Sequence, residues 1–209
     1  MSFEPIENYG VIGNMCSIAL VGVNGSIDFL CYPNFDSPTV FAALLDDERG
    51  GCFQIEPQLK EKRARQLYLP DTNILLTRFL AEEGVAELTD YMPIEADGKQ
   101  PNEIIRTLAV IRGEVDFKMR CQPRFNYGRC GHTASIEDRY AIFSPASDSC
   151  SPMALYSTVT LQQQAGDVIS EFSLRAGEKV TFVFGGVRAQ GEQPEMEFVE
   201  QRFHETARF

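Results

Sequence analysis

The chain has 209 residues, of which 44% are hydrophobic and 23% are charged, so its composition is that of a folded globular protein and not of a disordered one. Its formal net charge at pH 7 is −11. An acidic surface repels phosphate backbones and anionic lipids, so we expect neither a nucleic acid nor a membrane as a partner. No apolar run approaches the roughly 20 residues of a membrane span, and the N-terminal residues lack the basic start and apolar core of a signal peptide. The sequence therefore predicts a cytoplasmic protein.

The cysteines and histidines argue against a metal or cofactor. The six cysteines are Cys16, Cys31, Cys52, Cys121, Cys130 and Cys150. None forms a C-x-x-C pair, and the only histidines are His132 and His204, so zinc and haem spacings are missing. Without a secretion signal we expect free thiols, with Cys31 and Cys121 buried as small apolar residues in strands. Cys130-Gly131-His132 invites a nucleophile or metal-site interpretation, but a loop turn is favoured because no third ligand is visible.

The N-terminal part predicts a tight hairpin. Ser17–Val21 and Ser26–Leu30 are short and mostly apolar. Asn24-Gly25 lies between them, and this dipeptide most readily takes positive φ at both turn positions.

The hairpin leads into a loop and a predicted helix. Two prolines, Pro33 and Pro38, bracket the loop of Cys31–Pro38 and remove two backbone donors, so this loop is stiff and not part of a central ladder. Ser37 or Thr39 is placed to cap a helix over Val40–Asp46, and Gly50-Gly51 ends the unit.

Short strands follow one another through most of the remaining chain. The clearest is Val115–Cys121, in which apolar and charged residues alternate, as in an antiparallel strand with one face in water. Ile104–Arg112 is a separate apolar candidate. Two further pairs of runs predict hairpins, 74–81 with 85–92 and 168–174 with 179–187.

About twelve candidate strands and one clear helix predict an all-β fold, a large antiparallel β-sandwich with one or two short helices. Parallel βαβ folds are disfavoured because no helical stretch recurs between strands. We expect the sandwich domain to cover residues 1–189. Residues 190–209 then form a linker, in which Glu195–Phe209 could begin a helix.

Several ordered motifs carry a family resemblance. They are Ile6-Glu7-Asn8-Tyr9-Gly10-Val11-Ile12-Gly13, Asn24-Gly25-Ser26-Ile27-Asp28-Phe29-Leu30-Cys31, Pro33-Asn34-Phe35-Asp36-Ser37-Pro38-Thr39-Val40-Phe41-Ala42, Leu88-Thr89-Asp90-Tyr91-Met92-Pro93, Arg112-Gly113-Glu114-Val115 and Pro123-Arg124-Phe125-Asn126-Tyr127-Gly128. Together they resemble the N-terminal domain of the bacterial glucoamylase- and trehalase-like enzymes of glycoside hydrolase family 15. The resemblance covers about the first two-thirds of the chain, and it implies a supersandwich of many antiparallel strands.

The resemblance implies a non-catalytic role for this chain. Family members hydrolyse α-glucosidic bonds with inversion, and this needs two carboxyl groups set well apart. Both are glutamates on a helical barrel that follows the sandwich, so no catalytic residue is carried over here. The expected partner is that C-terminal barrel of the same polypeptide, with an α-glucan or trehalose as substrate. An exposed docking face could also form a homodimer. The alternative is an independent carbohydrate-binding module, although such modules often use tryptophan and this chain has none.

Two Pro-x-Phe loops supply the candidate site. The residues that combine aromatic faces with hydrogen-bonding groups are Phe35, Asp36, Arg124, Phe125, Asn126, Tyr127 and Arg129. Such a set suits a domain interface or a sugar ring, but Phe35 and Phe125 could instead plug the ends of the sandwich. Asn34 and Asn126 replace an arginine and an aspartate of the family pattern, so any ion pair made there by relatives is in doubt.

The acidic residues give no convincing catalytic pair. Asp46-Asp47-Glu48 and Glu82-Glu83 adjoin glycines and are typical of solvated turns. Asp28 and Asp90 lie in or at the ends of strands, where we expect burial and a hydrogen bond to a neighbouring backbone amide.

Overall fold

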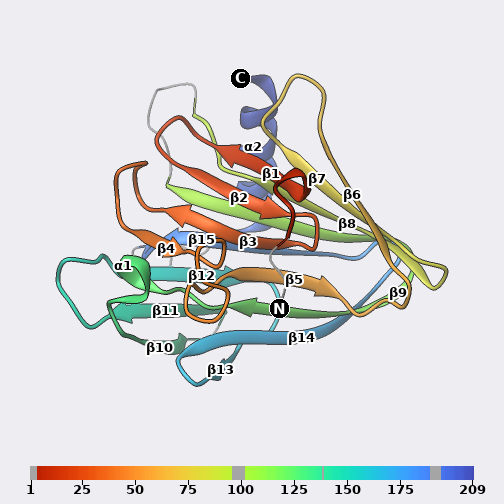
Figure 1. Cartoon of the computed structure of the whole chain (residues 1–209). Helices are drawn as coiled ribbons and strands as arrows, with labels where there is room; N and C mark the ends of the chain where they lie inside the picture. The colour runs from red at the N-terminus through yellow and green to blue at the C-terminus, as the bar shows by residue number, and fades with distance from the viewer. Residues whose placement is uncertain (1–3, 96–101, 138, 189–193) are drawn as a thin grey trace.

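The chain folds into two antiparallel sheets that share one long strand (Figure 1). The computed structural model describes residues 4–95, 102–137, 139–188 and 194–209. The shared strand is β9 (Glu103–Cys121), whose second half lies in sheet A and whose first half lies in sheet B. The predicted all-β sandwich is confirmed.

Sheet A has the order β1-β2-β3-β5-β9-β14-β13, with β4 paired to the end of β3. Its other strands are β1 (Tyr9–Gly13), β2 (Ile18–Gly22), β3 (Ser26–Cys31), β4 (Thr39–Phe41), β5 (Phe53–Pro57), β13 (Gln162–Gln164) and β14 (Asp167–Arg175). Sheet B has the order β6-β7-β8-β9-β15-β12-β11-β10. Its other strands are β6 (Arg63–Tyr68), β7 (Leu75–Leu80), β8 (Gly84–Tyr91), β10 (His132–Glu137), β11 (Tyr140–Pro145), β12 (Met153–Ser157) and β15 (Lys179–Gly186). The helical elements are η1 (Ile6–Asn8), α1 (Phe125–Gly128) and α2 (Met196–Arg208).

Strand β9 passes from one sheet to the other at Gly113. Its first half pairs with β8 and β15, and its second half pairs with β5 and β14. Gly113 has φ 82°, and a Cβ there would lie 2.2 Å from the Glu83 carbonyl oxygen, so the corner needs glycine. The two strands expected on either side of it are therefore one strand. The alternation predicted for Val115–Cys121 is confirmed, because Val115, Phe117, Met119 and Cys121 are all buried.

Residues 168–187 do not form the predicted hairpin. Strand β14 pairs with β9 in sheet A, and β15 pairs with the other half of β9 in sheet B. The turn between them crosses from sheet to sheet at the β9 corner, where Ala176 N–H donates to Gly113 O over 2.9 Å. Both strands prefer β9 because it offers each an uninterrupted ladder. The other predicted hairpin, now β7 and β8, is confirmed.

The predicted helix over Val40–Asp46 is wrong. Thr39–Phe41 forms β4 and pairs with β3, with Phe41 opposite Leu30. Val40 and Phe41 are buried, and their burial in the sandwich outweighs the weak local preference for helix. The residues that follow form a turn, in which Asp46 N–H donates to Ala42 O over 3.2 Å.

The hairpin of β2 and β3 is confirmed, with a different turn from the one expected. Gly25 has φ 81°, whereas Asn24 keeps a negative φ and its side-chain oxygen accepts a hydrogen bond from Ser26 N–H over 3.0 Å. A bulge between Leu20 and Val21 shifts the register. One glycine at positive φ followed by a strand fits a three-residue loop better than a two-residue turn.

A buried arginine of sheet B, with a carboxylate partner in the same sheet, joins the two sheets. Arg106 on β9 is 0% exposed and donates to Asp90 on β8, over 2.8 Å from Nε to Oδ1 and 3.3 Å from Nη2 to Oδ2. Its guanidinium also donates across the sandwich to Gly25 O over 2.8 Å and to Phe53 O, and it stacks on the Phe53 ring. Burial raises the pKa of the Asp90 carboxyl, and Arg106 opposes that rise.

The two strand aspartates are therefore buried as expected, but neither is bound mainly through a backbone amide. Asp90 pairs with a guanidinium. Asp28 accepts hydrogen bonds from the Tyr9 hydroxyl over 2.8 Å and from the Ser26 hydroxyl over 2.5 Å.

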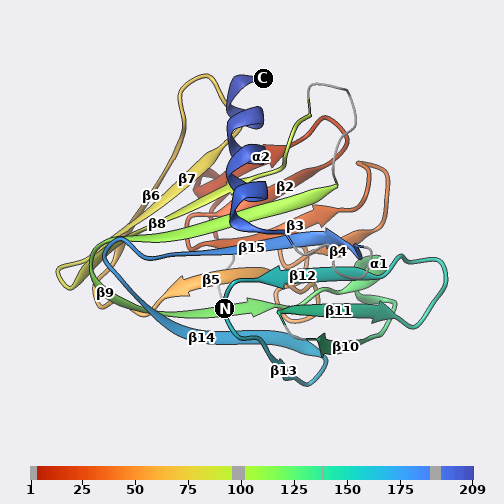
Figure 2. The same ribbon diagram turned by 180° about the vertical axis from the view of Figure 1, so that it is seen from behind.

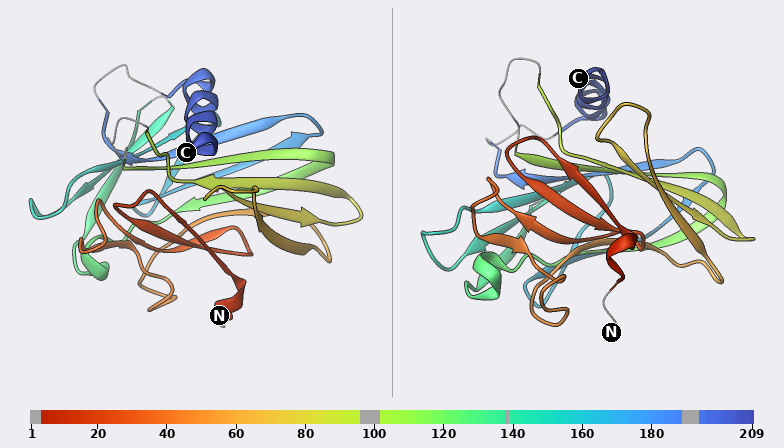
Figure 3. Two further views of the ribbon diagram at one scale, coloured as in Figure 1. Left: turned by 90° about the horizontal axis from the view of Figure 1, so that it is seen from above. Right: turned by 45° about the horizontal axis from the view of Figure 1, so that its top comes forward.

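Helix α2 covers the outer face of sheet B (Figure 2). Its Val199 joins Tyr91, Ile105 and Val183 in a second apolar cluster, outside the sandwich. The Tyr91 hydroxyl also donates to Val199 O over 3.1 Å. Figure 3 shows this helix on the opposite side of the molecule from the N-terminal strands. Within the described residues no helix has the length and apolarity to cross a membrane. The expected domain boundary after residue 189 falls outside the described residues and stays a prediction.

We predict that Arg106→Ala lowers the free energy of unfolding by about 3–5 kcal/mol. The substitution leaves the Asp90 carboxylate buried without its partner and removes one donor from each of two carbonyl groups. Urea unfolding followed by far-ultraviolet circular dichroism measures the change.

Arg78→Ala is the matched control. Arg78 forms an exposed ion pair with Glu87, with 2.6 Å between Nε and Oε1, and its loss should cost less than about 1 kcal/mol. Equal losses in the two variants would contradict the role assigned to Arg106.

Candidate functional site

The two Pro-x-Phe loops lie side by side at one end of the sandwich (Figure 1). The first connects β3 to β4, and the second leaves β9 and contains α1. The Arg124 N–H donates to Val40 O over 2.7 Å and fastens the second loop to β4. Residues about 90 positions apart in sequence are brought together because both loops begin where a strand of sheet A ends.

A cleft of about 170 Å³ lies between these loops and the loop that precedes β12. It is lined by Tyr32, Pro33, Ser37, Pro38, Thr39, Val40, Phe125, Asn126, Ser149, Cys150, Ser151 and Met153. Hydroxyl and amide groups therefore face apolar surface, which is the usual composition of a site for a small polar ligand. Burial, with the Glu103 carboxylate nearby, raises the pKa of Tyr32 to about 12, so its hydroxyl keeps its proton at neutral pH.

The predicted site residues divide into two groups. Phe125 is 3% exposed and Asn126 also lines the cleft. Phe35, Asp36, Tyr127 and Arg129 do not line it and are exposed on the surrounding loops. Phe125 thus plugs the sandwich end, as the structural alternative predicts, whereas Phe35 does not.

Arg124 forms an ion pair with Asp167 on β14. Its guanidinium makes a two-pronged pair with the Asp167 carboxylate, at 2.6 and 3.0 Å, and Gln122 Nε2 donates to the same group over 2.8 Å. The Asp167 pair raises the pKa of Arg124. The two parallel hydrogen bonds fix the Arg124 side chain and so hold the second loop against β14. A guanidinium so engaged is not free to bind a ligand.

Tyr127 is held in an unfavourable backbone conformation. Asn126 and Tyr127 have φ of 53° and 58° inside the single turn of α1. Asparagine tolerates positive φ, but a bulky residue there costs of order 1–3 kcal/mol and is kept only where its surroundings fix it. The result is a tyrosine ring directed to solvent at 49% exposure.

The His132 ring packs against the second loop through Phe125. His132 begins β10, its ring contacts Phe125 and Phe143 edge-on, and its Nε2 lies 3.0 Å from Gly166 O. Burial lowers the pKa of His132. In the described residues no group of three or more histidine, cysteine or acidic side chains is placed to hold a metal ion. Cys130 therefore lies in a turn beside a packed histidine, which agrees with the loop interpretation of Cys130-Gly131-His132.

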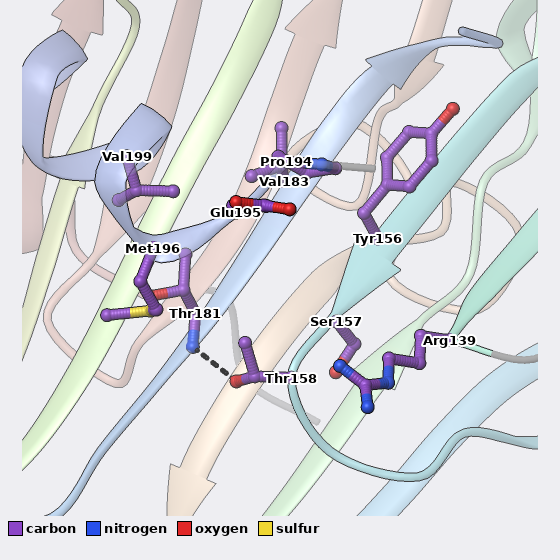
Figure 4. A pocket seen from close by; sticks show the side chains of 10 residues that line it. All are labelled: Arg139, Tyr156, Ser157, Thr158, Thr181, Val183, Pro194, Glu195, Met196 and Val199. Carbon is purple, nitrogen blue, oxygen red and sulfur yellow. Dashed lines mark hydrogen bonds between the residues drawn. The ribbon is translucent and has the colours of Figure 1, made fainter. Parts of the chain in front are cut away.

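A second pocket, of about 310 Å³, lies where α2 begins on sheet B (Figure 4). Tyr156 and Thr158 line it from the β12 side, Thr181 from β15 and Met196 from α2. Thr181 N–H donates to Thr158 Oγ1 over 3.0 Å. Glu195 is the one carboxylate among its lining residues, so this pocket lacks the pair that glycoside hydrolysis requires. We interpret it as space left beneath the start of the helix.

Sequence reasoning missed part of the cleft. The sequence predicts Ser37 or Thr39 as a helix cap and gives no role to Ser149, Cys150 or Ser151. The Ser147–Pro152 run between two strands is a loop signal, but nothing in the sequence says which other loop it contacts. The acidic clusters are exposed turns, as expected.

The fold defines a large β-sandwich domain with a polar and apolar cleft at one end. The comparisons identify the family. The chain belongs to the trehalase-like N-terminal domain family, which matches residues 1–171.

Three relatives show the extent of the similarity. Trehalase 1 of Sulfolobus acidocaldarius is 44% identical over 119 residues, which are 57% of this chain and 19% of the relative. The trehalase of Thermoplasma volcanium is 36% identical over 130 residues, 61% of this chain and 21% of the relative. The trehalase of Mycolicibacterium smegmatis is 31% identical over 150 residues, 63% and 22% of the two chains. The chain thus spans about a fifth of the length of the curated relatives that it matches.

We predict that part of the pH dependence of stability comes from His132. Its folded pKa lies below its unfolded value, so the unfolded state takes up a proton first as the pH falls. Stability from this group is present above the unfolded pKa, about 6.5, and is lost below it. The urea midpoint should fall less between pH 8 and pH 5 in His132→Gln than in the wild type. His204→Gln, at an exposed position on α2, should retain the wild-type change. A parallel loss in all three proteins would contradict the assignment.

Proposed function

We propose that this chain is the non-catalytic N-terminal domain of a trehalase-like glycoside hydrolase, and that its loop end docks against a C-terminal helical-barrel catalytic domain and helps to shape the active site. The substrate of the whole enzyme would be trehalose or another α-glucoside, and its location the cytoplasm. The support is the family match together with curated relatives named trehalases that are about five times as long as the matched segment.

The observation that carries the docking role is a group of exposed apolar side chains at the loop end. Phe35 is 54% exposed, Leu45 is 62% exposed and Tyr127 is 49% exposed. The loops that carry Leu45 and Tyr127 are neighbours. A Cβ atom built on Gly128, next to Tyr127, would lie 3.2 Å from the carbonyl oxygen of Arg49 in the other loop. Exposed aromatic side chains near one another are typical of interface anchors. The strained turn under Tyr127 supports the same role.

The cleft chemistry supports a non-catalytic role. An inverting hydrolase places its two carboxyl groups about 6.5–9.5 Å apart, with room for a water molecule. The cleft is lined by hydroxyl, amide, thiol and apolar groups. Release of glucose from trehalose, maltose or isomaltose by the purified chain, above a buffer blank, would overturn this part of the proposal.

An independent carbohydrate-binding module is the second candidate. Thr39 lines the cleft between the two Pro-x-Phe loops. Its hydroxyl oxygen is buried and has no hydrogen-bond partner. A buried polar atom without a partner costs free energy, and the hydroxyl of a bound sugar could satisfy it.

Calorimetric titration separates the two candidates. The chain is titrated with its separately expressed C-terminal catalytic part and, in parallel, with trehalose, maltose and isomaltose. Heat from the catalytic part and none from the sugars supports docking. Millimolar or tighter sugar binding without the catalytic part supports a binding module.

We predict that Phe35→Ala and Tyr127→Ala each weaken binding of the catalytic part by about tenfold or more, since truncated aromatic anchors typically cost more than 1 kcal/mol. Ile111→Ala is the matched control. Ile111 is 53% exposed and lies on β9 two residues before the Gly113 corner, outside the two loops of the candidate site. Equal affinity of all four proteins would contradict docking through the loop end. Sedimentation of the isolated chain tests whether the same face forms a homodimer.

A further inference from the structure

Two thiols meet at the rim of the cleft. Cys130 lies between α1 and β10, and Cys150 lies in the loop between β11 and β12. The β10–β11 ladder ends with His132 opposite Pro145, and one further backbone hydrogen bond, from Ala146 N–H to Gly131 O over 2.8 Å, extends it. Cys130 is therefore brought beside the start of the loop that carries Cys150.

A turn then brings Cys150 back to Cys130. Cys150 N–H donates to Ser147 O over 3.1 Å, which reverses the chain. The Cys130 thiol is among the groups that raise the pKa of the Cys150 thiol, so the two side chains are neighbours. Both side chains are half-buried and pack against the main apolar cluster.

The other four thiols offer no comparable accessible pair. Cys31 and Cys121 are buried in strands, as expected. Cys16 and Cys52 are half-buried. Cys52 neighbours Cys121, but the Cys121 side chain is 0% exposed and so is closed to an oxidant in the folded protein.

We propose that Cys130 and Cys150 are a redox-sensitive pair that closes to a disulfide when a low-molecular-weight disulfide, such as glutathione disulfide, accumulates. One thiolate attacks glutathione disulfide, forming a mixed disulfide and releasing one glutathione thiolate. The second thiolate attacks the mixed disulfide at the protein sulfur and releases the second glutathione. The pair loses two electrons and two protons, and one glutathione disulfide becomes two glutathione molecules. All six cysteines are free in this structure, which corresponds to the reduced state.

The closed pair would fix one wall of the cleft. The disulfide would join the loop that contains Ser149 and Ser151 to the end of α1, which carries Phe125 and Asn126. The whole β10–β11 hairpin lies within the ring so formed. Burial raises the pKa of the Cys150 thiol, so this thiol is mostly protonated at neutral pH and reacts only when the oxidant is abundant. This inference holds whether the loop end docks against a catalytic domain or binds a sugar.

The test is oxidation of the reduced chain with glutathione disulfide at mildly alkaline pH, where more of each thiol is ionised. Trypsin cleaves after Arg129, Arg139 and Arg175, so the two cysteines fall in different peptides. We expect loss of two of the six thiols in a denatured thiol assay, and a single reducible cross-link between the peptides 130–139 and 140–175. The oxidised chain should also unfold at a higher temperature, because the ring restricts the unfolded state.

Three serine variants make the result specific. Cys130→Ser and Cys150→Ser should each lose the cross-link and the rise in unfolding temperature. Cys16→Ser, which removes a half-buried thiol elsewhere, should keep both. The proposal is overturned if all six thiols persist, if only glutathione adducts form, or if the cross-link joins Cys52 to Cys121.

Discussion

The arrangement of the two sheets depends on the buried guanidinium of Arg106, which pairs with Asp90 in sheet B and bonds to two carbonyl groups of sheet A. A guanidinium with no exposed surface is costly to remove from water. Its cost is offset by acceptors from three segments: the Asp90 carboxylate on β8, Gly25 O in the β2–β3 turn and Phe53 O on β5. Because one rigid, planar group bonds to both sheets, it fixes how far apart they lie and which residues face each other. The loop end inherits that alignment, since its loops begin where sheet A strands end.

At the loop end, residues that hold the loops in place are next to residues whose side chains are exposed to solvent. Arg124 is fastened to Asp167 and Phe125 is buried, while Tyr127, two residues further on, is turned out into solvent. The first loop repeats this arrangement, with Pro33 at the cleft and Phe35 exposed. An exposed ring on a fixed base loses little conformational entropy on binding. This is a physical reason for placing anchors directly beside structural residues.

Local pattern predicted most strands but not how they pair. The alternation in Val115–Cys121 reflects a solvated face and a core face, so it was readable directly from the sequence. The Val40–Asp46 segment was misassigned because its pairing partner, β3, is set by tertiary packing. The crossover after β14 looked like a hairpin because a short polar turn joins it to β15, and only the position of β9 shows otherwise. The motifs located both loops of the cleft. The third wall, near Ser149 and Ser151, comes from a distant loop whose sequence predicts a loop but not its contact with the other two.

The shared strand has a consequence for synthesis of the chain on the ribosome. Strand β9 ends at Cys121, but its later neighbours, β14 and β15, end only at Arg175 and Gly186. Sheet A cannot be completed until β14 has emerged, and sheet B cannot be completed until β15 has emerged, so the long strand β9 has one unpaired edge in each sheet for the intervening residues. Unpaired strands of this kind are prone to associate with other chains. Folding of this domain during translation is therefore a late event, and the nascent chain depends on protection of β9 until its last strand has been made.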